Sequence, residues 1–348
     1  MTYFDLLQKS GTRLLITGDS LAYNRYSYDD GGDSRPNAYD CGVGMGSWAF
    51  ALRDRIFTSD PQFIYGDDLT FDCESTAGIA NDSDVPNTAM FGGRIRTLYP
   101  TDKAAFSAKI RSDMLVLYLQ KRLDHPCLFD IAVDGVPVVR DVDTQGAKED
   151  FAGYGLLILS LPCAADRDVH TISFTNIRGQ SPAITVAGIG SRRTDVVLNG
   201  KGSQQVSFFI ENFEDRIGRH KPDIILLSLS ANDRVFIAPD VLRRNLTELF
   251  TLISNQLPDC KVLFLLPPSS HKPDEPELDM HPYTSLLTAE AYNRTVEYVC
   301  RSFHADTLRI SSLFDDNRTS DWRYDNIHLN RAGNEVLLEA AAHRLGLN

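Results

Sequence analysis

The stretch that decides the fold is Arg13-Leu14-Leu15-Ile16-Thr17-Gly18-Asp19-Ser20, in which a short apolar run stops at a glycine and a polar turn. An uninterrupted apolar run of this length predicts a strand that is buried on both faces, as in parallel sheets. Ser47 then fits the N-cap of a helix over residues 48–57. The polar loop between strand and helix is long for a compact domain, and such loops are more often functional than not.

The same strand-then-helix rhythm returns from Thr194 to the end of the chain. The predicted strands cover residues 196–198, 224–229, 262–266 and 307–310, and the predicted helices cover residues 204–217, 240–256, 286–303 and 330–345. Together with the strand over residues 13–17, this pattern predicts five parallel strands with helices on both faces of the sheet.

The intervening region changes to a period of two, which is typical of antiparallel strands. Short strands are predicted over residues 114–119, 129–133, 136–139, 156–159, 170–174 and 184–186. Asp134-Gly135 joins two of them and is a strong hairpin signal. We therefore predict a discontinuous α/β domain over residues 1–100 and 193–348, with a small inserted β-sandwich, jelly-roll-like, over residues 101–192.

Polar motifs follow the predicted strands at the points where active sites form in open α/β sheets. Gly18-Asp19-Ser20 follows the first strand, and Asp325-Asn326-Ile327-His328 precedes the last helix. A serine hydroxyl is a weak nucleophile until a base accepts its proton, and an imidazole suits that task near neutral pH. We predict Ser20 as nucleophile and His328 as base. Asp325, three residues before His328, would orient the imidazole by accepting a hydrogen bond from it.

Acyl transfer also requires donors for the developing oxyanion. Asn199–Ser203 follows the second strand, and Ser230–Asp233 follows the third. The predicted donors are the Ser20 and Gly202 backbone N–H groups and the Asn232 side-chain amide. Gly200 and Gly46 are alternatives to Gly202.

These four motifs, in this order, resemble the four sequence blocks of the SGNH/GDSL hydrolases. Ser20, Gly202, Asn232 and His328 match the four residues for which the family is named, and the resemblance covers residues 1–100 and 193–348. It implies a flavodoxin-like three-layer sandwich and hydrolysis of esters, thioesters or sugar O-acyl groups. The chain departs from the family pattern where Ser230 replaces a glycine before Asn232, and where Asn199 and Gly202 are closely spaced.

The resulting hypothesis is a serine esterase that removes short acyl groups, acetyl first, from a carbohydrate or small glycoside. Tyr23, Asn24 and Arg25 follow the nucleophile closely and are predicted substrate contacts, because aromatic rings stack on sugar faces and polar groups bind hydroxyls. A lipid esterase, lysophospholipase or thioesterase is the first alternative. A non-catalytic glycan-binding protein is the second.

Bulk properties limit the partners. The net charge of -12 and the pI near 5.1 argue against nucleic acid and against an anionic membrane surface. No apolar run approaches the roughly 18 residues of a membrane span. The six cysteines form no C-x-x-C pair, and the first residues lack a signal-peptide pattern, so a cytoplasmic location is expected. No cofactor or metal is expected, a metal site at His271, Asp279 and His281 being a minor alternative, and a homo-oligomer is left open.

Overall fold

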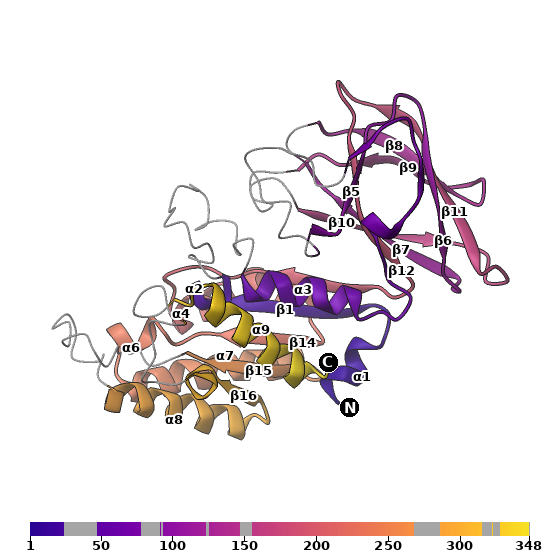
Figure 1. The fold of residues 1–348 in the computed structure, drawn as a ribbon. Coiled ribbons are helices and arrows are strands. Elements are labelled where there is room, and N and C mark those ends of the chain that lie inside the picture. Colours follow the sequence, from indigo (N-terminus) through magenta and orange to yellow (C-terminus); the bar gives the residue numbers. More distant parts are fainter. Residues whose placement is uncertain are drawn as a thin grey trace. The chain divides into compact units, whose positions relative to one another are not determined.

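The computed structural model describes residues 1–23, 47–77, 91, 93–122, 125–146, 155–267, 286–314, 322 and 328–347, without the side chains at positions 23, 77, 286–289 and 311. The chain forms two compact units. The first comprises Met1–Leu7, Thr12–Leu52 and Asp195–Asn348, and the second comprises Gln8–Gly11 and Arg53–Thr194. Figure 1 shows the helices and strands of both units.

The first unit is built on a five-stranded sheet of order β13-β1-β14-β15-β16. Its strands are β1 (Thr12–Gly18), β13 (Thr194–Leu198), β14 (Ile224–Ser228), β15 (Lys261–Leu266) and β16 (Asp306–Arg309). Neighbours from β1 to β16 pair in parallel. Asn199 and Lys201 donate to the Ile16 and Gly18 carbonyls, so the chain after β13 advances beside β1 in the same direction. This is the flavodoxin-like strand order, and it confirms the predicted parallel sheet.

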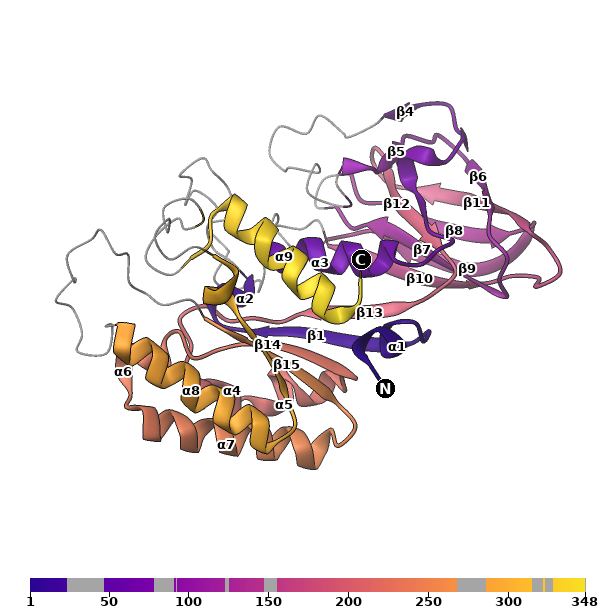
Figure 2. The same ribbon diagram turned by 60° about the horizontal axis from the view of Figure 1, so that its bottom comes forward.

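Helices cover both faces of this sheet. The helices of this unit are α1 (Tyr3–Leu7), α2 (Ser20–Tyr23), α3 (Trp48–Thr58, which continues into the second unit), α4 (Val206–Glu211), α5 (Phe213–Arg216), α6 (Asp233–Phe236), α7 (Pro239–Gln256), α8 (Leu286–Ser302) and α9 (Arg331–Leu345). Figure 2 shows α3 and α9 on one face and α4, α7 and α8 on the other. Leu15, Leu227 and Phe264 of the strands pack with Leu246 of α7 and Val296 of α8 in one buried cluster. Short 3-10 turns lie at Gly218–His220 and Ile310–Leu313.

The helix predicted over residues 204–217 is interrupted at Asn212. The Asn212 backbone leaves helical geometry at φ -111° and ψ 30°, and its side chain donates to the Phe208 carbonyl. An asparagine side chain that binds nearby backbone groups competes with the helix. The segment therefore forms α4 and α5 instead of one continuous helix.

The second unit is a sandwich of two antiparallel sheets. One has the order β10-β7-β12-β5-β4, with β2 also pairing with β12, and the other has the order β3-β6-β11-β8-β9. Its strands are β2 (Ile64–Tyr65), β3 (Phe71–Asp72), β4 (Thr76–Ala77), β5 (Arg96–Leu98), β6 (Ala104–Lys109), β7 (Met114–Gln120), β8 (Leu128–Val133), β9 (Val136–Asp143), β10 (Leu156–Pro162), β11 (Val169–Arg178) and β12 (Ile184–Gly190); a 3-10 turn covers Gly66–Asp68. Leu117 and Ile184 of one sheet share a buried cluster with Ile131 and Phe174 of the other. The predicted hairpin is confirmed, since Asp134 and Gly135 both have positive φ between β8 and β9.

The predicted domain boundary at residue 100 lies too far along the chain. The short strands β2 to β5 all precede residue 100, and they pair with strands of the inserted sheets. Each has only two or three residues, too few to show an alternation in a polar stretch. The sandwich unit consequently begins at Arg53.

The helices of the described ranges include none with the length and apolarity that crossing a bilayer requires.

Candidate active site

Ser20 begins α2, two residues after the end of β1. Gly18, the last residue of β1, has φ +142°, and a Cβ built on it would lie 1.8 Å from the Ser228 carbonyl oxygen. Only glycine therefore allows β1 and β14 to approach so closely at this edge. The Asp19 N–H donates to the same carbonyl at 2.8 Å. The chain turns sharply there, and the Ser20 side chain is left half-buried.

His328 meets Ser20 from the other end of the chain. Its Nε2 lies 2.8 Å from the Ser20 Oγ. A serine hydroxyl at this distance can donate its proton to a neutral imidazole. His328 lies three residues before α9, whose N-cap Asn330 accepts a hydrogen bond from the Gly333 N–H at 3.0 Å. The two side chains therefore lie within hydrogen-bonding distance, as expected, while their roles as nucleophile and base stay predictions.

Asp325, the predicted third member of the triad, lies outside the described residues and stays a prediction. The structure describes Trp322 before Asp325 and residues 328–347 after it. The Asn330 N–H donates to the Trp322 carbonyl at 3.0 Å, and the Trp322 ring stacks on Phe314 with centroids 4.1 Å apart.

The second and third motifs meet at the same edge of the sheet. The Asn232 side-chain amide donates one hydrogen to the Gln204 carbonyl at 3.1 Å, and a primary amide carries a second hydrogen that can donate. The Lys201 N–H donates to the Gly18 carbonyl at 2.8 Å, which commits that amide to the sheet edge. Gly202 follows Lys201 in this turn and stays a candidate donor beside Gly200. Gly46 lies outside the described residues.

A buried charged cluster, which the sequence analysis missed, lies against the nucleophile. It consists of Asp19, Asp233 and Arg234, all buried. Burial raises the pKa of Asp19 to about 6, against the Leu21 N–H and the charges of His328 and Arg234, which favour the carboxylate. Burial also raises the pKa of Asp233 to about 7, with the Asp19 charge adding to it. Burial lowers the pKa of Arg234 to about 10, while Asp19 opposes that shift.

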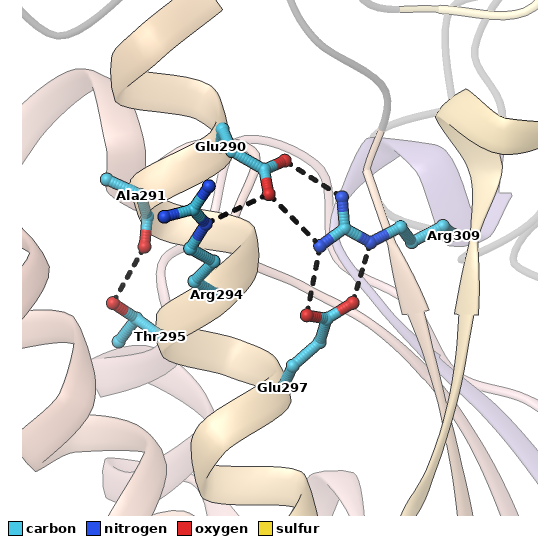
Figure 3. Close-up of polar contacts among 6 residues, drawn as sticks. All are labelled: Glu290, Ala291, Arg294, Thr295, Glu297 and Arg309. Carbon is cyan, nitrogen blue, oxygen red and sulfur yellow. Dashed lines mark hydrogen bonds and ion pairs between the residues drawn. The ribbon is translucent and has the colours of Figure 1, made fainter.

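At the carboxyl end of β16, Arg309 is bound by two carboxylates of α8, as Figure 3 shows. The guanidinium donates to Glu297 at 2.6 and 2.9 Å and to Glu290 at 2.8 and 3.3 Å. Arg294 also donates to Glu290, at 3.1 Å. This paired network raises the pKa of Arg309 above its usual range. The network joins the end of β16 to α8. The chain continues from this end of β16 towards His328.

The predicted substrate contacts are only partly placed. Tyr23 is the last residue of α2, one turn after Ser20, and its side chain is not among those described. Asn24 and Arg25 lie outside the described residues, as do His271, Asp279 and His281 of the minor metal alternative. These assignments stay predictions.

Comparison with known proteins gives a family match over part of the chain. Residues 172–336 match the model of the GDSL-like Lipase/Acylhydrolase family. The matched stretch contains the glycine turn, Asn232 and His328, whereas Ser20 lies before the inserted unit and outside it. No curated protein matches the chain.

Two solved structures match this chain at low identity and with TM-scores below 0.5. A peptidoglycan O-acetylesterase is 14% identical with a TM-score of 0.45, over 99% of this chain and 95% of that one. An acetylxylan esterase from Geobacillus stearothermophilus is 17% identical with a TM-score of 0.37, over 44% of this chain and 74% of that one. The family match over residues 172–336, the flavodoxin-like sheet and the ordered motifs at its edge support an SGNH/GDSL hydrolase, a class of carboxylic ester hydrolase.

Proposed function

We propose that this chain removes short acyl groups, acetyl first, from a carbohydrate or small glycoside through an acyl-enzyme on Ser20. The observation that carries the proposal is the 2.8 Å approach of the Ser20 Oγ to the His328 Nε2 at the carboxyl edge of the sheet. A hydroxyl and an imidazole so placed form the nucleophile and base of acyl transfer.

In the first half-reaction, the Ser20 oxygen attacks the ester carbonyl carbon while His328 accepts the hydroxyl proton. The oxyanion of the tetrahedral intermediate accepts hydrogen bonds from the Ser20 and Gly202 N–H groups and from the Asn232 amide. The bond to the leaving oxygen then breaks, and His328 returns its proton to that oxygen, which departs as an alcohol.

In the second half-reaction, water attacks the acyl-serine carbonyl and gives its proton to His328. The intermediate collapses to a free carboxylic acid, and the Ser20 oxygen recovers a proton from His328. Asp325 would orient the imidazole throughout. The buried Asp19 carboxylate lies within electrostatic reach of His328, so its ionised form favours the imidazolium formed in both halves.

The acyl preference rests on the polar and aromatic composition of residues 23–40, which suits sugar hydroxyls better than an alkyl chain. The test compares para-nitrophenyl acetate with the octanoate, and measures acetate release from O-acetylated xylan and O-acetylated peptidoglycan. We expect hydrolysis of the acetyl ester, poor turnover of the octanoyl ester and acetate release from one of the polymers.

Faster turnover of the octanoyl ester would favour the lipid esterase alternative. Glycan binding without hydrolysis of any ester would favour the non-catalytic alternative. The matched control is Ser20→Ala, in which every acetyl-releasing activity should disappear while the fold is retained.

A further inference from the structure

One buried tryptophan bonds to the residue after Ser20 and, through Asn334, to the residue after His328. The Trp48 indole Nε1–H donates to the Leu21 carbonyl at 2.9 Å, one residue after the nucleophile. The Trp48 backbone N–H donates to the Asn334 Oδ1 at 3.0 Å. The Asn334 amide nitrogen in turn donates to the Leu329 carbonyl at 3.2 Å, one residue after His328.

Both side chains are buried, and every N–H hydrogen they carry is engaged in a hydrogen bond. Trp48 is 1% exposed and Asn334 is 3% exposed. Besides Leu329, the Asn334 amide donates to the Asn330 carbonyl at 2.8 Å, so its oxygen and both hydrogens are engaged. The Trp48 N–H belongs to the first turn of α3, where a helix leaves its own N–H groups without partners. Asn334 supplies the acceptor that this turn needs.

The segment that carries the nucleophile has few constraints of its own. Helix α2 has only four residues, and its internal support is the Ala22 N–H bond to the Asp19 carbonyl and the Leu21 N–H bond to the Asp19 carboxylate. A single short turn is not stable by itself. The position of the Ser20 oxygen therefore depends on what holds Leu21 from outside.

We propose that Trp48 and Asn334 are positioning residues that set the Ser20–His328 geometry by bonding the nucleophile segment to the start of α9. The proposal rests on the proposed function, since it assigns these residues a role in the same acyl transfer. The bridge runs Leu21–Trp48–Asn334–Leu329 and acts beside the direct Ser20–His328 bond. Neither residue is required to touch the substrate.

Phenylalanine at position 48 tests the bridge, because it keeps the aromatic packing and removes the indole donor. Misplacement of a reacting group by about 1 Å can cost about 100-fold in rate. We expect Trp48→Phe to lower kcat on para-nitrophenyl acetate about 10- to 100-fold with little change in KM. The rate at which a fluorophosphonate labels the protein should fall by a similar factor, because that reaction needs the same Ser20–His328 pair.

The chain offers a matched control in Tyr3→Phe. The Tyr3 hydroxyl donates to the buried Val262 carbonyl at 3.0 Å, at the start of β15 and therefore at the opposite edge of the sheet. This variant also removes one aromatic donor from a backbone carbonyl, together with the interaction of the Tyr3 hydroxyl with Asp306. We expect it to lower Tm about as much as Trp48→Phe does, with kcat and the labelling rate within about twofold of wild type.

A double-mutant cycle with Asn334→Leu tests whether the two residues act together. If they form one bridge, adding Trp48→Phe to Asn334→Leu should change kcat little further. Equal labelling of Trp48→Phe and Tyr3→Phe, or fully multiplicative effects in the double mutant, would overturn the proposal. A wild-type protein that neither hydrolyses the ester nor reacts with the fluorophosphonate would instead overturn the proposed function, and the bridge's catalytic role with it.

Discussion

Asp19 shows how much the nucleophile's surroundings depend on single buried charges. The carboxyl is fully buried, one residue before Ser20, and its Oδ1 accepts a hydrogen bond from the Leu21 N–H at 3.0 Å. Burial disfavours the ionised form, while Arg234 and His328 favour it. The sequence placed Asp19 beside a predicted nucleophile but contained no periodic signal that Asp233 and Arg234 would be buried with it.

The raised pKa of Asp19 predicts a pH dependence of stability. Its pKa is about 6 in the folded protein against 3.8 ordinarily, so between these values the native state holds the proton that the unfolded state has released. Relative to Asp19→Asn, which keeps the Oδ1 acceptor, the wild-type free energy of unfolding should therefore fall as pH rises from about 4 to about 6, by on the order of 2–3 kcal/mol. Urea titrations of both proteins at several pH values measure this difference. A difference that does not vary with pH, or that grows with pH, would contradict it.

Asn232 is the predicted side-chain donor to the oxyanion. Asn232→Ala should lower kcat on an acetyl ester by about 100- to 1,000-fold with a small effect on KM, because the lost hydrogen bond strengthens only in the transition state. Asn212→Ala is the control, since Asn212 also donates its amide to a backbone carbonyl, that of Phe208 at 2.9 Å. Steady-state kinetics of both variants check the prediction, which fails if Asn232→Ala retains most of the wild-type kcat.

Among the elements, β16 and α8 are joined by the Arg309 network of Figure 3. Arg309 is 30% exposed at its side chain and binds Glu290 and Glu297. Arg309→Met should lower the free energy of unfolding by about 1–2 kcal/mol, less than a buried network would, because solvent screens part of it. Arg309→Lys should recover only part of this loss, since an ammonium cannot bind two carboxylates in the forked geometry. Denaturant unfolding measures the free energy of each protein. Equal stability of Arg309→Met and the wild type would contradict this prediction.

The positions of helices and strands in the α/β unit were largely predictable, because buried parallel strands and amphipathic helices produce recognisable spacings of apolar residues in the sequence. Ile224–Ser228 and Pro239–Gln256 lie within one or two residues of their predictions. The break at Asn212 could not be predicted from the spacing of apolar residues, because it depends on one side chain that donates to a nearby backbone carbonyl. The bridge through Trp48 was missed for a related reason, as a tryptophan after an N-cap is indistinguishable in sequence from an ordinary core residue.

At the scale of the molecule, the chain folds as two units with separate cores. We expect Phe174→Ala, which empties a fully buried position of the sandwich core, to destabilise that unit by about 3–5 kcal/mol. Scanning calorimetry should show the sandwich transition lowered while the α/β transition stays in place. A single transition that shifts as a whole would show instead that the two units unfold together.

The candidate functional residues could be predicted from the order of the motifs more accurately than the domain boundary could be predicted from the strand pattern. Three motifs follow predicted strands and the fourth precedes the last helix. A parallel sheet brings the carboxyl ends of its strands to one edge, so Ser20 and His328 could be matched across the whole chain. The boundary failed because the strands before residue 100 are too short to show a pattern and are defined only by their partners.

The direct test of the account is where a fluorophosphonate attaches and how fast it does so. Peptide mapping should place the label on Ser20, and His328→Gln should slow labelling at least about 1,000-fold while leaving the fold intact. A label on another residue, or labelling of His328→Gln at the wild-type rate, would contradict the assignment of Ser20 and His328 as nucleophile and base.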